Sequence, residues 1–129
     1  MTSNSTYKID EHRRLCLQKD LKELSFWIHT LEYVNSELNH LSVIEKQLIK
    51  LASVSVTIQA IRRKNVLNMA SLCKYEQELK TEYEYGKIEY DKVRLKVHEQ
   101  KRENYLKYLI EYNSFKDQFY LLLKKYQRK

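Results

Sequence analysis

Residues 105–126 decide the fold, and they read YLKYLIEYNSFKDQFYLLLKKY. Apolar and aromatic positions recur there at alternating steps of three and four, which is the heptad spacing of a packed helical seam. The seam consists of Tyr105, Tyr108, Tyr112, Phe115, Phe119, Leu122 and Tyr126. Other apolar side chains flank it, so the face is wider than one partner helix requires. This stretch therefore predicts a long helix that packs against more than one neighbour.

The rest of the 129-residue chain has the same helical character, with one Gly and no Pro. Sheet-rich folds need turn residues at roughly every 8–12 positions, which this chain does not supply. Two further stripes precede the seam: Leu17, Leu21, Leu24, Ile28, Leu31 and Leu38 in one, and Val54, Ile58, Ile61, Met69, Leu72, Leu79 and Tyr83 in the other. We predict an all-α fold, an elongated antiparallel three-helix bundle with coiled-coil-like packing, because short connections make adjacent helices antiparallel. The expected helices cover about 8–52, 57–85 and 87–127, after a disordered tail over residues 1–7.

Two turns are expected between these helices. The run Ser53-Val-Ser-Val-Thr57 is the weakest helix-forming stretch and predicts the first turn. Gly86 predicts the second, because glycine accepts a left-handed helix C-cap without strain. A break near Asn39–Ser42 remains an alternative, since Ser42 and Glu45 have capping-box spacing.

Enzymatic chemistry finds little support in the residue pattern. A single Gly excludes a glycine-rich phosphate loop, and Cys16 and Cys73 are interpreted as small core residues. Glu37 and His40 have the Glu-x-x-His spacing of a metal-binding helix, but a di-iron bundle needs two such motifs. The expectation is a protein without catalytic residues, cofactor, metal or small-molecule substrate.

The termini and hydropathy bear on location. No apolar run reaches the roughly 18 residues that span a membrane, and the polar N-terminus lacks the apolar region of a signal peptide. A cytoplasmic protein with reduced cysteines is expected.

The net charge of +7 belongs mainly to the last third, where residues 86–129 hold twelve basic and six acidic side chains. Folding the chain at the two predicted turns places six basic residues near mid-bundle: Lys46, Lys50, Arg62, Arg63, Lys64 and Lys107. Such a basic band is typical of surfaces that bind nucleic acid or anionic membrane. Glu45 and Glu111 lie at the same level, however, so a solvated surface with mixed charge is the stronger expectation.

The expected helix lengths are unequal, and both outer helices should extend past the shorter middle one. Each projecting end has one apolar side, formed by Leu17, Leu21 and Leu24 at one end and by Phe119, Leu122, Leu123 and Tyr126 at the other. A two-fold homodimer would cover these stripes, whereas a folded-back N-terminal helix would cover them within one chain. The main functional hypothesis is a non-enzymatic structural or protein-interaction module that self-associates or binds another protein. The alternative is a basic-surface binder of nucleic acid or anionic membrane.

Two stretches resemble a family of uncharacterised small helical proteins common in flavobacteria. One is Trp27-x3-Leu31-x-Tyr33-x3-Glu37-Leu38. The other runs from His98 through Arg102-x2-Tyr105-x2-Tyr108 to Lys116-x2-Phe119-Tyr120-x2-Leu123-x-Lys125-Tyr126. Together they cover about half of the chain, and the middle segment departs from the family, which has more His and Asn there. The resemblance implies a bacterial cytoplasmic helical protein with no assigned activity and no functional residues to transfer.

Overall fold

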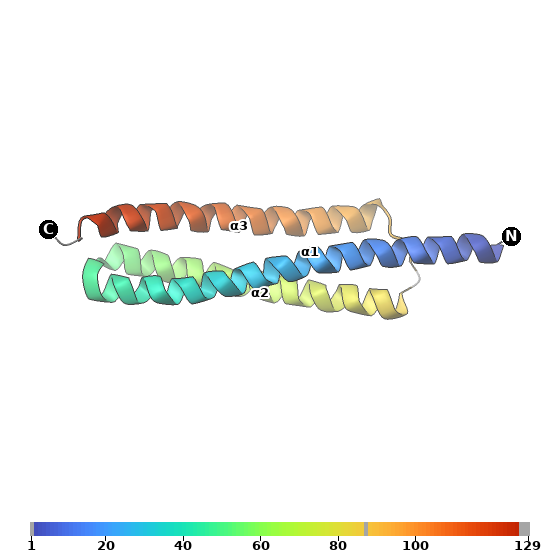
Figure 1. The fold of residues 1–129 in the computed structure, drawn as a ribbon, viewed down its shortest axis with the longest axis horizontal. Helices are drawn as coiled ribbons and strands as arrows, with labels where there is room; N and C mark the ends of the chain where they lie inside the picture. Colours follow the sequence, from blue (N-terminus) through green and yellow to red (C-terminus); the bar gives the residue numbers. More distant parts are fainter. Residues whose placement is uncertain (1, 87, 127–129) are drawn as a thin grey trace.

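The computed structural model describes residues 2–86 and 88–126, which form three long helices lying side by side (Figure 1). They are α1 (Thr2–Ile44), α2 (Ala52–Tyr85) and α3 (Lys92–Lys124), with a short π-helical segment, η1 (Glu45–Ile49), after α1. α1 and α3 run in the same direction and α2 runs in the opposite one. The predicted all-α antiparallel three-helix bundle is confirmed for the described residues. α1 begins at Thr2, where the sequence predicted a disordered tail.

The first turn lies at Lys50 and Leu51, before the predicted position at 53–57. Lys50 adopts the left-handed conformation with φ 53°, and its N–H donates to the Glu45 carbonyl oxygen at 2.7 Å. The β-branched stretch is helical because Val54 packs into the core, and the helix accommodates a hydrogen bond of 2.9 Å from the Thr57 hydroxyl to the Ser53 carbonyl oxygen. Tertiary packing thus overrides the low helix propensity of this segment.

The alternative break near Asn39–Ser42 is also wrong. α1 continues through these residues to Ile44, because Leu38 and Leu41 are both buried in the core on the same helical face. The backbone irregularity comes one turn later, in η1, where Ile49 still reaches the core.

Gly86 ends α2 in an extended conformation, with φ −74° and ψ 155°, so the predicted left-handed cap is wrong. Glycine suits this position for a steric reason, because an added Cβ would lie 2.6 Å from the Glu82 carbonyl oxygen. The same carbonyl accepts from the Gly86 N–H at 2.9 Å and from the buried Arg13 side chain of α1 at 2.6 Å, which places a positive charge at the C-terminal end of α2. α3 begins only at Lys92, where the Asp91 carboxylate accepts from the Arg94 N–H at 3.1 Å as an N-cap.

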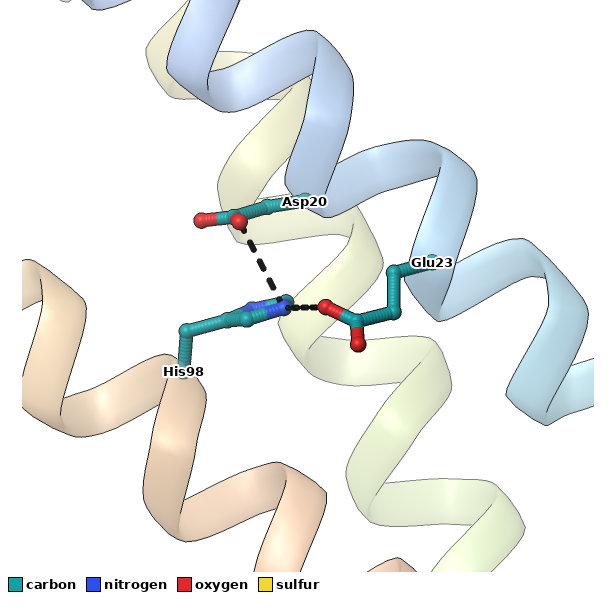
Figure 2. A group of neighbouring side chains, drawn as sticks. All are labelled: Asp20, Glu23 and His98. Atoms are coloured by element: carbon teal, nitrogen blue, oxygen red, sulfur yellow. Dashed lines mark hydrogen bonds and ion pairs between the residues drawn. The ribbon is translucent and has the colours of Figure 1, made fainter.

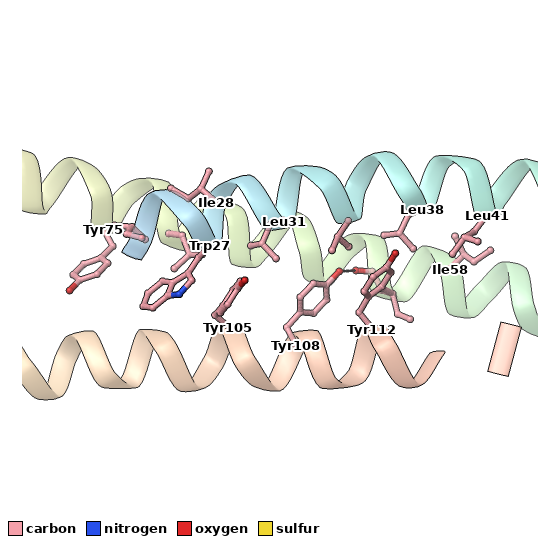
Figure 3. Packing of buried hydrophobic residues seen from close by; sticks show 14 of the residues in the cluster. Trp27, Ile28, Leu31, Leu38, Leu41, Ile58, Tyr75, Tyr105, Tyr108 and Tyr112 are labelled. Carbon is pink, nitrogen blue, oxygen red and sulfur yellow. Dashed lines mark hydrogen bonds between the residues drawn. The ribbon is translucent and has the colours of Figure 1, made fainter. Parts of the chain in front are cut away.

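The core runs the length of the bundle, and α3 contributes mainly aromatic rings. Figure 3 shows Tyr105, Tyr108 and Tyr112 projecting from α3 toward the leucines of α1. These three and Phe119 are buried, while Phe115 and Leu122 are half-buried against the same core. The predicted seam is therefore confirmed up to Leu122.

The predicted apolar overhangs are mostly absent, because α2 is longer and α3 ends earlier than expected. Only the first turns of α1 project past the end of α2 (Figure 1). Leu17, Leu24 and Phe119 are buried within the single chain, and Leu21, Leu122 and Leu123 are half-buried against the core. Of the predicted interaction surface only Tyr126 is exposed, so most of these side chains pack within the single chain.

Candidate functional site

Three side chains from two helices converge inside the bundle (Figure 2). Asp20 and Glu23 stand one turn apart on α1, and His98 faces them from α3. The His98 Nε2 atom lies 2.8 Å from Glu23 Oε1 and 3.4 Å from Asp20 Oδ1, and the three ligand-type atoms lie within 4.8 Å of one another. We call these three residues the polar cluster.

A further hydrogen-bonding group holds each member of the polar cluster from behind. The Tyr75 hydroxyl of α2 lies 2.7 Å from His98 Nδ1, so α2 fixes the orientation of the ring. The Tyr90 hydroxyl donates to Asp20 Oδ2. Arg102 donates to both oxygens of Glu23, at 2.8 and 2.7 Å. Groups from α2, from the connection between α2 and α3, and from α3 therefore determine the positions of the cluster atoms.

The surroundings of the polar cluster are largely closed to solvent. His98 is 1% exposed, and Trp27 stacks on its ring with centroids 5.1 Å apart. The side chain of Glu23 is 31% exposed and forms the open side of the cluster. The two hydrogen bonds from Arg102 hold the pKa of Glu23 at about 2, assisted by the hydrogen bond to His98. Burial raises the pKa of Tyr75, so its hydroxyl keeps its proton beside His98.

Sequence reasoning missed this cluster, although part of a signal was present. His98 lies one heptad before Tyr105 and thus in the same seam, and Asp20 lies between the core leucines Leu17 and Leu24. Their proximity depends on the axial register of α1 against α3, which no local pattern contains.

The Glu-x-x-His pair does not form a site. Glu37 accepts from the Tyr112 hydroxyl and from Lys116 Nζ, the latter at 3.0 Å, whereas His40 is exposed to solvent. Glu37 thus links α1 to α3 as a structural group.

The structure separates Lys46 and Lys50 from the other members of the predicted basic band. Asn65 binds the Leu31 carbonyl oxygen, which places Arg62, Arg63 and Lys64 near the level of Val34 on α1. Lys46 and Lys50 belong to the turn at the end of the bundle, about 18 Å farther along the helix axis. Lys64 bonds Glu111 at 2.6 Å on the α3 side. Since consecutive helical residues diverge by about 100°, Arg62 faces away from that side. Lys107 is exposed on α3 at about the level of Arg62, because its neighbour Tyr108 donates to the Ile61 carbonyl oxygen.

The two cysteines are not core residues, contrary to the interpretation from sequence. Cys73 is exposed and Cys16 is partly buried, and both are free thiols. Burial raises the pKa of Cys16, which disfavours a reactive thiolate. His12 Nε2 lies 3.5 Å from Cys16 Sγ on the exposed side of α1.

A groove runs between α1 and α2, with a hollow of about 530 Å³. Its lining consists of Glu32, Asn35, Ser36, Asn65, Val66, Met69 and Ala70, which we call the α1–α2 groove. At about 100° per residue these positions lie on the opposite sides of α1 and α2 from the residues that contact α3, such as Glu23 and Tyr75. The groove therefore lies on the face of the helix pair that α3 leaves uncovered.

No helix in the described part of the chain has the length and apolarity to cross a membrane. Comparison with protein-family models, with curated proteins and with solved structures found no match to this chain.

Proposed function

We propose that the chain is a non-enzymatic protein-interaction module that self-associates, with a second copy docking on the α1–α2 groove. The observation that carries the proposal is a buried, unpaired amide oxygen at this groove. Asn65 is 2% exposed, and its Nδ2 donates to the Leu31 carbonyl oxygen at 3.1 Å. Its Oδ1 is buried and has no hydrogen-bond partner among the described residues.

An unpaired buried acceptor costs about 1–3 kcal/mol, and a donor entering the groove would recover that free energy. The rest of the lining suits a helix, since Val66, Met69 and Ala70 offer small or flexible apolar contacts. Val66 is 58% exposed although it stands beside the buried Asn65. Asn35 also lines the groove and is exposed, so it supplies an amide donor at the docking face.

Charge favours a second copy as the occupant of the groove. α1 carries five Lys and Arg against six Asp and Glu, and α2 carries five against four, so the helix pair is close to neutral. α3 carries eight against four. Like copies therefore repel each other through α3 and approach through the α1–α2 face.

A two-fold symmetric dimer can also form through the α1–α2 groove. Two α1–α2 hairpins that meet groove to groove form four antiparallel helices, with each α3 on the outside. Two-fold association of this kind is the commonest oligomer of soluble proteins.

Size-exclusion chromatography with light scattering tests the proposal. We expect a mass near twice the 15.8 kDa of one chain at high micromolar concentration. Val66→Glu should give a monomer with unchanged circular dichroism, because it introduces a charge into the groove. Ile110→Glu is the matched control, since Ile110 is 70% exposed on α3, and this variant should remain dimeric.

A wild-type monomer at every concentration, or an equal response of the two variants, would overturn the groove as the docking face. Heparin chromatography tests the alternative function in the same samples. Retention that falls steeply with salt would favour a binder of nucleic acid or anionic membrane, because released counterions drive such binding. Weak retention is expected for the interaction module.

A further inference from the structure

We infer that Asp20, Glu23 and His98 form a binding site for one divalent transition-metal ion, of which Zn²⁺ is the best-fitting example. The donor set is one imidazole nitrogen and two carboxylate oxygens, which are ligand types that zinc accepts. Three protein ligands leave a fourth position for water on the side where Glu23 is exposed.

The spacing of the donor atoms suits a shared ion. Ligands held about 2.0–2.2 Å from one ion are separated by roughly 3–3.5 Å in tetrahedral or octahedral geometry. The distances from His98 Nε2 are 2.8 Å to Glu23 Oε1 and 3.4 Å to Asp20 Oδ1. An ion therefore enters with small side-chain shifts and replaces the direct contacts between the ligands.

The groups behind the ligands would remain in place when an ion binds. His98 offers Nε2 to the centre while Nδ1 stays on the Tyr75 hydroxyl. Asp20 offers Oδ1 while Oδ2 stays on Tyr90. Glu23 keeps the hydrogen bond from Arg102 Nε on Oε2, whereas the bond from Arg102 Nη2 to Oε1 gives way to the ion. Metal ligands in proteins are held by such outer hydrogen bonds, which fix the ring orientation and the ligand charge.

The local charge also points to a cation. Asp20 is 6% exposed, and its carboxylate oxygens contact the Tyr90 hydroxyl and His98 Nε2. Arg102 compensates Glu23 through its bidentate contact. Two carboxylates therefore converge on one centre beside the guanidinium of Arg102, and the burial of charged groups is costly without compensation. A bound divalent cation supplies that compensation and links α1 to α3.

The experiment is a calorimetric titration of Zn²⁺ into the purified full chain, with Co²⁺ as a spectroscopic probe. All proteins carry Cys16→Ser, because His12 and Cys16 form an exposed pair that could bind zinc independently. We expect one ion per chain and a higher unfolding temperature in its presence. The Co²⁺ complex should show visible d–d bands from nitrogen and oxygen ligands.

Variants assign the ligands and the positioning residue. Asp20→Asn and Glu23→Gln should each weaken zinc binding by more than about 100-fold, while Glu103→Gln, an exposed carboxylate on α3, should leave binding unchanged. Tyr75→Phe keeps all three ligands and should weaken binding by about 10–100-fold. Circular dichroism without metal confirms that each variant is folded before titration.

Two results would overturn the site. One is an absence of zinc binding by the folded Cys16→Ser protein. The other is equal affinity in Asp20→Asn, Glu23→Gln and the Glu103→Gln control, which would locate the ion elsewhere on the chain.

Discussion

Phe119, with 1% of its surface exposed, is the most completely buried aromatic residue of the seam. Truncation to Ala should lower the free energy of unfolding by about 3–5 kcal/mol, because a fully buried ring leaves a cavity. Leu121→Ala, two residues away on the exposed side of α3, should change it by less than about 0.5 kcal/mol. Urea unfolding followed by circular dichroism measures both. Equal midpoints would show that the seam is not the core.

Glu37 should contribute to a loss of stability in acid. Burial raises the pKa of Glu37, but the hydrogen bonds from Tyr112 and Lys116 together lower it by more. The net result is a pKa below the usual value for glutamate. The unfolded chain therefore binds the proton at higher pH than the folded chain does. The contribution of Glu37 to the free energy of unfolding is complete above the pKa of an unfolded glutamate, about 4.3. It is lost as the pH falls from that value to the lower pKa of Glu37 in the folded protein.

Urea midpoints between neutral pH and about pH 3 test this linkage. Glu37→Gln should flatten the acid limb of the profile, whereas Glu103→Gln, whose side chain is exposed on α3, should follow wild type. A profile unchanged by Glu37→Gln would contradict the assignment.

Lys50 is the one described non-glycine residue with positive φ, and it forms the turn that reverses the chain between η1 and α2. Lys50→Gly should raise the free energy of unfolding by about 1 kcal/mol, because glycine adopts this conformation without a Cβ clash. Lys46→Gly, inside η1, should lower it by about 0.5–1 kcal/mol as the matched control. If both substitutions destabilise the protein equally, Lys50 is not in the left-handed conformation in solution.

The end of α2 depends on a side chain of another helix. Arg13→Met removes the donor to the Glu82 carbonyl oxygen and should cost about 1–3 kcal/mol. Hydrogen exchange should quicken in the last turn of α2, while the turn at Lys50 keeps its protection. Lys22→Met, an exposed site on α1, should leave both regions unchanged.

At the scale of the molecule, the register between helices decides which distant residues meet. Hydrogen bonds join Asn65 to Leu31 and Arg13 to Glu82, so Cys73 lies near the level of Glu23. Cys16 is then about 10 Å away along the bundle axis alone, and a disulfide requires Cα atoms within about 7 Å. Mass spectrometry of the oxidised monomer should find no crosslink within one chain. An intrachain Cys16–Cys73 bridge would contradict this register.

The sequence by itself determined the helical class, the three-helix antiparallel order and the seam from Tyr105 to Leu122. These properties follow from apolar periodicity and from the scarcity of Gly and Pro, which act over a few helical turns. These properties do not depend on which residues of another helix lie beside a given helix.

Only the tertiary structure decided where the chain turns and what the turn brings together. In an antiparallel helix pair, moving the turn by one residue shifts the partner of every residue by two positions. A small error in the predicted position of the turn at Lys50 therefore changes the contacts along the whole bundle. That register buries Leu17, Leu24 and Phe119 within one chain and separates Lys46 from Arg62. The parallel register of α1 and α3 places Asp20 and Glu23 opposite His98. Such contacts depend on the packing of whole helices, which no short stretch of the sequence records.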